Sequence, residues 1–207
     1  MTNRVLFKYR GLEPWQHLLD ILVHQRLHSC PFHQLNDPME GVFYYYPEAV
    51  TRQLIDRIAD RKDALGICAL SAAHNSSLMW SYYASGHRGL VLGVEIDMTT
   101  AAGVVAVEDV NYEEWNNFHI SGSIDPNQAA KRILSRKLAT WRHEQEVRVF
   151  THSTYFAVSI KYVYLGCKME KETESLLRPI IEKLLPGVVI RKMERGDLDR
   201  PDIAGGT

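Results

Sequence analysis

The chain has 207 residues, 45% of them hydrophobic, and its 24 basic and 25 acidic side chains nearly cancel. This length and composition are typical of a globular protein with one well-filled core. A net charge of −1 provides no global field that would attract nucleic acid, so such a partner would need a local basic patch.

The hydrophobic segments and the cysteines predict a cytoplasmic protein with no membrane partner. The longest apolar runs, "GLVLGV" and "YFAVSIKYVYLG", are shorter than the roughly 20 residues that a membrane helix needs. The polar start "MTNRVLFKYR" has no secretory hydrophobic region. Cys30, Cys68 and Cys167 are odd in number and far apart, so we expect free thiols in a reduced compartment.

Hydrophobic periodicity predicts an alternation of strands and amphipathic helices. In chain order we expect a strand over 4–10, a helix over 13–27, a turn at 36–41, a helix over 47–63, a strand over 65–71, a short helix over 76–86, strands over 88–97 and 103–112, a helix over 126–141, strands over 146–150 and 158–166, a helix over 171–185 and a strand over 187–193. Several strands follow one another directly, which favours one α+β domain over 1–194. The Gly-, Asp- and Pro-containing end, 195–207, is predicted to be a flexible tail.

Three possible metal or nucleic-acid motifs have simpler explanations. "HEQEV" begins like a zinc-protease HExxH motif, but Val147 stands where the second ligand is required. The segment 24–33 contains three histidines and a cysteine, yet its spacing matches no common zinc pattern, and we expect solvent-facing histidines there. The basic residues of 131–137 are expected to form a solvated helix face. We therefore predict no metal site.

The segment "TWRHEQEVRVF" contains the most informative charge pattern. Glu144, Glu146 and Arg148 are two residues apart, so they would share one face of a strand. Two carboxylates beside a cation can hold sugar hydroxyls and a developing positive charge. The same pattern is also expected of a solvated or ion-paired strand. At a catalytic cleft, such strand-face carboxylates would contribute little to the core.

Four blocks of the chain resemble a bacterial family known as domain of unknown function 2971. These blocks are "LFKYR", "LNDPMEG", "NSSLMWSYYASGHRGLVLGVEID" and "WRHEQEVRVF", in that order over 5–166. The chain is more distantly similar to ADP-ribosyltransferases of the Arg-Ser-Glu type. These enzymes place an Arg on the first strand, a Ser at the end of a middle strand, and a Glu-x-Glu pair at the start of a later strand, as Arg10, Ser71 and Glu144-Gln145-Glu146 do here.

The second resemblance implies a fold of split, mixed or antiparallel sheets with flanking helices and with NAD bound between the sheets. NAD would be a substrate, and ADP-ribose would pass to an unknown acceptor, whether protein, nucleic acid or small molecule. We expect five residues to contact NAD: Arg10 and Ser71, which the resemblance places there, and Tyr9, Asn75 and Tyr83.

Physical chemistry assigns roles to the glutamates, to Arg10 and to the tyrosines. Cleavage of the nicotinamide–ribose bond passes through an oxocarbenium-like state, which an ionised Glu146 would stabilise. Glu144 would act as general base toward the acceptor. The Arg10 guanidinium would bind the pyrophosphate, and Tyr9 or Tyr83 would stack on nicotinamide.

Three functions remain open from the sequence. The first is an NAD-consuming ADP-ribosyltransferase or NAD glycohydrolase, in a bacterial toxin or phage-defence effector. The second is a metal-dependent enzyme of nucleic acids or nucleotides. The third is a catalytically inert binding module with the same fold. Release of nicotinamide distinguishes the first function from the other two, and a requirement for divalent metal marks the second.

Overall fold

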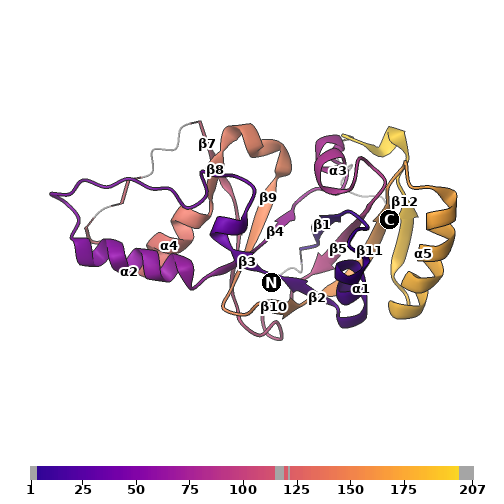
Figure 1. Ribbon diagram of the computed structural model, residues 1–207, viewed down its shortest axis with the longest axis horizontal. Coiled ribbons are helices and arrows are strands. Elements are labelled where there is room, and N and C mark those ends of the chain that lie inside the picture. Colours follow the sequence, from indigo (N-terminus) through magenta and orange to yellow (C-terminus); the bar gives the residue numbers. More distant parts are fainter. Residues whose placement is uncertain (1–3, 115–118, 121, 201–207) are drawn as a thin grey trace. The chain divides into compact units, whose positions relative to one another are not determined.

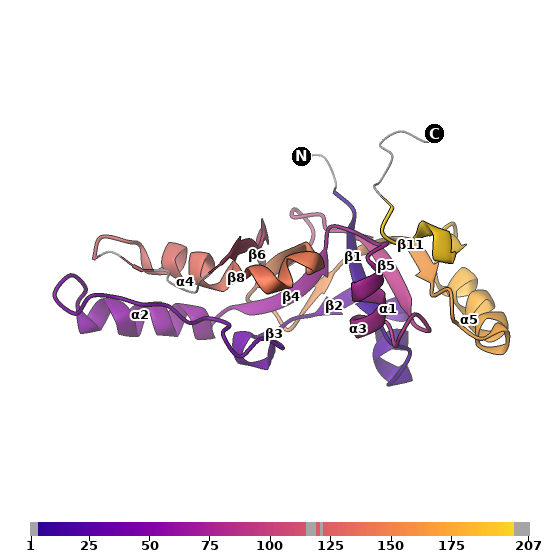
Figure 2. The same ribbon diagram turned by 90° about the horizontal axis from the view of Figure 1, so that it is seen from above.

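The computed structural model describes residues 4–114, 119–120 and 122–200. The chain divides into two compact units (Figures 1 and 2). Unit 1 consists of Met1–Arg26, Ser71–Asp97 and Ala157–Thr207, and unit 2 of Leu27–Leu70 and Met98–Phe156.

The described residues form helices and strands in the following order. They are β1 (Leu6–Arg10), α1 (Trp15–His24), β2 (Arg26–His28), β3 (Cys30–Pro31), the 3-10 helix η1 (Phe32–Gln34), α2 (Arg52–Asp63), β4 (Gly66–Ser71), α3 (Ser77–Tyr83), β5 (Leu90–Glu95), β6 (Val104–Asp109), β7 (Asn111–Glu113), α4 (Pro126–Leu134), β8 (Arg136–Leu138), η2 (Ala139–Glu144), β9 (Glu146–Thr151), β10 (Tyr155–Ala157), β11 (Ser159–Leu165), α5 (Lys171–Leu184), β12 (Val189–Lys192) and η3 (Arg195–Asp197).

Unit 1 is built on a sheet in the order β12-β11-β5-β1. β5 pairs antiparallel with both β1 and β11, whereas β12 joins β11 in parallel after the crossover through α5. Phe7 of β1 also pairs with Ser71, the last residue of β4. One face of this sheet is covered by α3, because Trp80 packs with Tyr9 and Val91 in one buried cluster.

Unit 2 combines the strands β4-β9-β6, with β3 beside β4, and two neighbouring helices, α2 and α4 (Figure 1). β7 and β8 form a separate parallel pair, and β2 pairs with β10. α4 packs on the strands, since Leu134 shares a cluster with Ile67 and Phe150. On its other side Ile133 packs against Ile58 of α2.

The predicted α+β class, with mostly antiparallel pairing, is confirmed. Every predicted strand and helix has a counterpart, but the helix predicted over 126–141 was wrong beyond Leu134. Ser135 leaves the helix, and its side chain donates a hydrogen bond to Glu108 while its carbonyl accepts one from Asn111. The chain then continues as β8 and η2.

The last predicted segment, 195–207, is described only as far as residue 200. Residues 195–197 form η3, and Asp199 accepts a hydrogen bond from the Ser77 backbone N–H at 2.8 Å. Residues 201–207 lie outside the described residues.

Candidate functional site

A buried cluster of charges in unit 2 is centred on Arg148 of β9. Its side chain is fully buried, with 0% exposed. Two guanidinium nitrogens donate to Glu40, from Nη1 to Oε2 at 2.8 Å and from Nη2 to Oε1 at 2.6 Å. Nε donates to Glu146 Oε1 at 2.7 Å, and Nη1 also reaches the Leu134 carbonyl at the end of α4. A cation at a helix C-terminus is favourable because carbonyl groups remain unpaired there.

A second buried cation, Lys137 of β8, joins the remaining carboxylate to the cluster. Its ammonium donates to Glu144 Oε2 at 2.5 Å and to Glu146 Oε2 at 3.1 Å. It also lies 4.8 Å from the centre of the Trp141 ring. Three carboxylates, those of Glu40, Glu144 and Glu146, therefore surround two cations in a site that water barely reaches.

Local backbone geometry brings Glu144 and Glu146 to the same ammonium. Glu144 is the last residue of η2, and Gln145 adopts a left-handed conformation with φ of 44° before β9 begins at Glu146. The prediction that Glu144 shares a strand face with Glu146 and Arg148 was therefore wrong. The expectation that these carboxylates contribute little to the core was wrong too, because Glu144 and Glu146 are each only 4% exposed.

Glu40 reaches the cluster from a turn. Asp37 Oδ1 accepts a hydrogen bond from the Met39 backbone N–H at 2.9 Å. The Asp37 carbonyl accepts another from the Glu40 backbone N–H. These bonds confirm the turn predicted at Asn36-Asp37-Pro38.

Burial and pairing act in opposite directions on the pKa values of the cluster. Burial alone would raise the pKa of Glu146, but the charges and hydrogen bonds of Arg148 and Lys137 outweigh it and hold that pKa below its ordinary value. For Glu40 burial prevails over its pairing with Arg148, so its pKa is raised. Burial would lower the pKa of Lys137, yet Glu146 and Glu144 raise it overall. The cluster thus holds Glu146 ionised more firmly than Glu40.

Tyr112 contacts the cluster at the first residue of β9. Its hydroxyl oxygen accepts a hydrogen bond from the Glu146 backbone N–H at 2.7 Å. Burial raises the pKa of this phenol to about 12, so it stays protonated at neutral pH.

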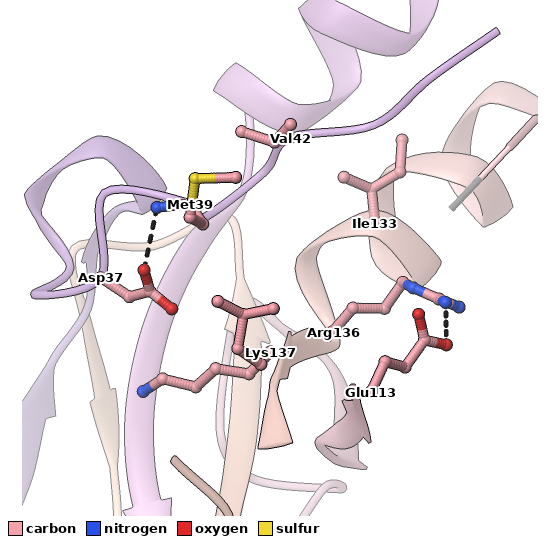
Figure 3. A pocket seen from close by; sticks show the side chains of 8 residues that line it. Asp37, Met39, Val42, Glu113, Ile133, Arg136 and Lys137 are labelled. Carbon is pink, nitrogen blue, oxygen red and sulfur yellow. Dashed lines mark hydrogen bonds and ion pairs between the residues drawn. The ribbon is translucent and has the colours of Figure 1, made fainter. Parts of the chain in front are cut away.

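A small pocket lies next to the cluster in unit 2 (Figure 3). It has an apolar wall and a polar wall, and Lys137 belongs to both the pocket and the cluster. The residues that line it are Asp37, Met39, Val42, Glu113, Ile133, Arg136, Lys137 and Leu138. Figure 3 shows the Arg136 guanidinium paired with the Glu113 carboxylate across this wall.

Two of the proposed NAD-binding residues are enclosed in unit 1. Tyr9 is 6% exposed, its hydroxyl donates to the Ala73 carbonyl at 2.9 Å, and its ring meets Trp80 edge-on. Ser71 is 1% exposed, and its hydroxyl oxygen accepts from the Ala73 N–H at 3.2 Å. These contacts organise the loop between β4 and α3.

The other three are more accessible in unit 1. Arg10 is the last residue of β1 and is half-buried. Asn75 donates through its side-chain amide to the Arg200 carbonyl at 2.7 Å. Tyr83 is half-buried at the end of α3, while Trp80 on the same helix is fully buried.

Two weaker candidates can now be placed. The described residues contain no group of three or more His, Cys, Asp or Glu side chains arranged to hold a metal ion. The predicted basic helix face was wrong, because Arg136 and Lys137 belong to β8 and Lys137 is buried.

No protein-family model, curated protein or solved structure matches the chain. Within the part of the chain that the structure describes, no helix is both long and apolar enough to cross a membrane.

Glu40 was not among the site residues predicted from the sequence, and Lys137 was predicted only as part of a helix. Glu40 is 108 residues from Arg148 in the chain, and no local pattern connects them. The sequence does contain a local signal for Lys137. In "KLATWRHEQEVR" this lysine precedes the two glutamates at a separation that a tight turn can close.

Proposed function

We propose that the protein is an NAD-consuming enzyme that resembles ADP-ribosyltransferases and cleaves the nicotinamide–ribose bond. The observation that supports this most is the position of three residues within their strands. Arg10 ends β1, Ser71 ends β4 and Glu146 begins β9. These are the strand positions at which the Arg-Ser-Glu type of ADP-ribosyltransferase carries its signature residues.

The electrostatic state of Glu146 supports the same proposal. Its pKa is held low, so the carboxylate is ionised at neutral pH. Because the site is buried, this charge interacts strongly with neighbouring charges. Such a group can stabilise the positive charge that develops on ribose. Glu144 would prepare the acceptor, Arg10 would bind pyrophosphate and Tyr83 would stack on nicotinamide.

The proposal requires one rearrangement. Both carboxylate oxygens of Glu146 accept hydrogen bonds, Oε1 from Arg148 and Oε2 from Lys137 and Arg148. The 3.1 Å bond from Lys137 would have to open for the ribose 2′-hydroxyl to reach Oε2. Lys137 can keep its shorter bond to Glu144 during this step.

The same occupied carboxylate favours a second candidate, a binding module without catalysis. In that case the Arg148 cluster serves only to hold β9, β8 and the turn at Glu40 together. The acceptor of the first candidate, its cytoplasmic location and its use as a toxin or phage-defence effector belong to the proposal as well.

Nicotinamide release from NAD by the purified protein tests the proposal. We expect release by the wild type and a loss of about tenfold or more in Arg10→Lys, because an ammonium cannot bind pyrophosphate oxygens bidentately. Arg52→Lys, on the exposed face of α2, is the matched control and should leave the rate unchanged. Absence of nicotinamide release by the folded wild type would overturn the proposal.

A further inference from the structure

The loop 84–89, which follows α3 in unit 1, contains a histidine that the proposed function does not use. His87 is only 9% exposed. Its ring lies parallel to the Trp80 indole, at 8° and with the ring centroids 6.4 Å apart. Nδ1 is buried and has no hydrogen-bond partner among the described residues. Protonation would place a positive charge, with Nδ1 as an unpaired donor, in this buried position, so the folded loop favours the neutral ring.

The charges that act on His87 come from two neighbouring segments. Lys168, in the connection between β11 and α5, repels a proton on the ring, whereas Asp199, which follows η3, attracts it. Burial and the positive charge of Lys168 outweigh Asp199 and hold the pKa of His87 below its ordinary value of 6.5. The other ionisable side chains on the loop and around the Trp80 cluster are Tyr9, Tyr83, Arg88, Tyr162, Tyr164 and Cys167.

The backbone of this loop is strained. Ser85, Gly86 and His87 all have positive φ angles, of 50°, 60° and 69°. A left-handed conformation is unfavourable for residues that carry a Cβ, so surrounding contacts must hold Ser85 and His87 in it. The His87 N–H donates to the Trp80 carbonyl at 3.1 Å, and the His87 carbonyl accepts from the Lys168 N–H at 3.0 Å. Release of the loop would relieve this strain, which lowers the free energy that opening requires.

The loop also contacts the end of β1. Gly89 lies so close to the Arg10 carbonyl that a Cβ on Gly89 would overlap it, and Ser85 Oγ fills the space that a Cβ on Gly11 would take. Arg10 is paired with Leu90, the residue that follows the loop, in the register of β1 and β5. Movement of the loop would therefore change the surroundings of Arg10.

We propose that the loop 84–89 is a pH-dependent switch, in which protonation of His87 releases the loop from Trp80 and Lys168 and alters the surroundings of Arg10. The contribution of His87 to the closed loop is complete above about pH 6.5 and is lost as the pH falls toward the folded pKa. Over that range the ratio of open to closed loop should rise by up to about tenfold per pH unit. The switch goes beyond NAD cleavage, and none of its tests involves NAD.

Nuclear magnetic resonance of the full chain tests the titration of His87. The ring Cε1–H signal of His87, assigned by its absence from His87→Asn, should titrate with a pKa below 6.5. Asparagine suits this position because it tolerates a left-handed backbone and does not titrate. Lys168→Gln, a change at an exposed residue, should raise the pKa of His87 because it removes a like charge. A His87 pKa of 6.5 or higher in the wild type, or no change in Lys168→Gln, overturns the proposal.

Hydrogen exchange measures the opening of the loop. The backbone N–H groups of His87 and Gly89, which donate to the Trp80 and Ala84 carbonyls, should lose about threefold or more of their protection between pH 7 and pH 5.5, after correction for intrinsic rates. His87→Asn should remove this pH dependence, whereas His17→Asn, which removes an exposed histidine of α1, should keep it. Protection that does not change with pH in the wild type, or the wild-type dependence in folded His87→Asn, contradicts the proposal. Should His87→Asn fail to fold, the wild-type exchange and the titration in Lys168→Gln still decide.

The Nε–H resonance of Arg10 reports whether the loop acts on the end of β1. It should shift with the same pH midpoint as the loop N–H groups in the wild type, and it should not shift over this range in His87→Asn. A loop that opens while the Arg10 resonance stays constant would overturn the coupling between His87 and Arg10.

Discussion

At the scale of single residues, Arg148 is the central side chain of the charge cluster. It joins Glu40 and Glu146, which approach from distant parts of the chain, and it has no exposed surface. Removing a partner from a buried ion pair leaves uncompensated charges where water cannot solvate them.

Arg148→Met should therefore lower the free energy of unfolding by about 3–5 kcal/mol, as measured by urea denaturation at neutral pH. Arg52→Met is the control, because its ion pair with Asp56 involves an Arg52 side chain that is 83% exposed. Exposed pairs of this kind contribute about 1 kcal/mol or less. Similar losses for the two variants would show that the Arg148 cluster is not the electrostatic centre of unit 2.

The glutamates that Arg148 joins should respond differently to neutralisation. The pKa of Glu146 is lowered and that of Glu40 is raised, so at pH 7 ionisation of Glu146 stabilises the fold whereas ionisation of Glu40 is opposed by burial. Glu146→Gln should cost about 1.5–3 kcal/mol of unfolding free energy, and Glu40→Gln distinctly less. Urea denaturation of both variants at pH 7 measures the difference, and a larger cost for Glu40→Gln would reverse the assignment.

At the scale of elements, periodicity predicted most of the fold because the amphipathic helices bury one face, whereas β5 and β9 are apolar runs buried on both faces. The helix 13–27, for example, was recognisable from Leu18 and Leu22, which are fully buried. The error after Leu134 has a physical cause. Leu134 and Leu138 keep a helical spacing of four, and the intervening Arg136 and Lys137 are good helix formers. The pairing of β8 with β7 overrides that propensity.

The candidate site could be predicted only in part, because its members come from separate elements. Glu144, Glu146 and Arg148 were visible as a local charge pattern. Burial of that pattern depends on Lys137 and Glu40, which meet it only after β8 and the turn at 36–41 have folded. An alternating charged strand has the same sequence whether solvent or counter-ions surround it.

The N-cap of α4 offers a test at this scale. Asp125 accepts a hydrogen bond from the Gln128 N–H at 2.9 Å, and the other end of α4 supplies the Leu134 carbonyl to Arg148. Asp125→Ala should lower the free energy of unfolding by about 1 kcal/mol. Asn127→Ala, an exposed change in the first turn, should have little effect. Thermal or urea denaturation compares the two, and equal losses would refute the capping role.

At the scale of the whole molecule, the buried charges give unit 2 its own response to acid. The folded-state pKa of Glu146 lies below its ordinary value of 4.5, so its contribution to stability is complete above that pH and is lost as the pH falls toward the folded pKa. Glu40 acts in the opposite sense, because its raised pKa means that protonation favours the folded chain. In unit 1 the pKa of Glu174 is also lowered, by Lys192 and Arg178, but its side chain is 22% exposed and its pairs are screened.

Backbone amides of β9 should accordingly lose protection from hydrogen exchange at a higher pH than those of β5, as the pH falls below about 4.5. Mass spectrometry of peptides from the two strands, with exchange rates corrected for pH, measures this. The Glu146→Gln variant should show a smaller pH dependence in β9. If both strands lost protection at the same pH, and if Glu146→Gln did not change that pH, the assignment of acid sensitivity to the cluster would be contradicted.

The most direct test of the central claim is the rate of nicotinamide release from NAD by folded wild type and folded Glu146→Gln, with circular dichroism confirming that both are folded. The amide keeps the shape of the side chain but removes the charge that would stabilise the oxocarbenium-like state, so the proposal predicts a rate at least ~100-fold lower in the variant. Equal rates for the two proteins would contradict the claim and leave Glu146 as one partner in a structural ion cluster.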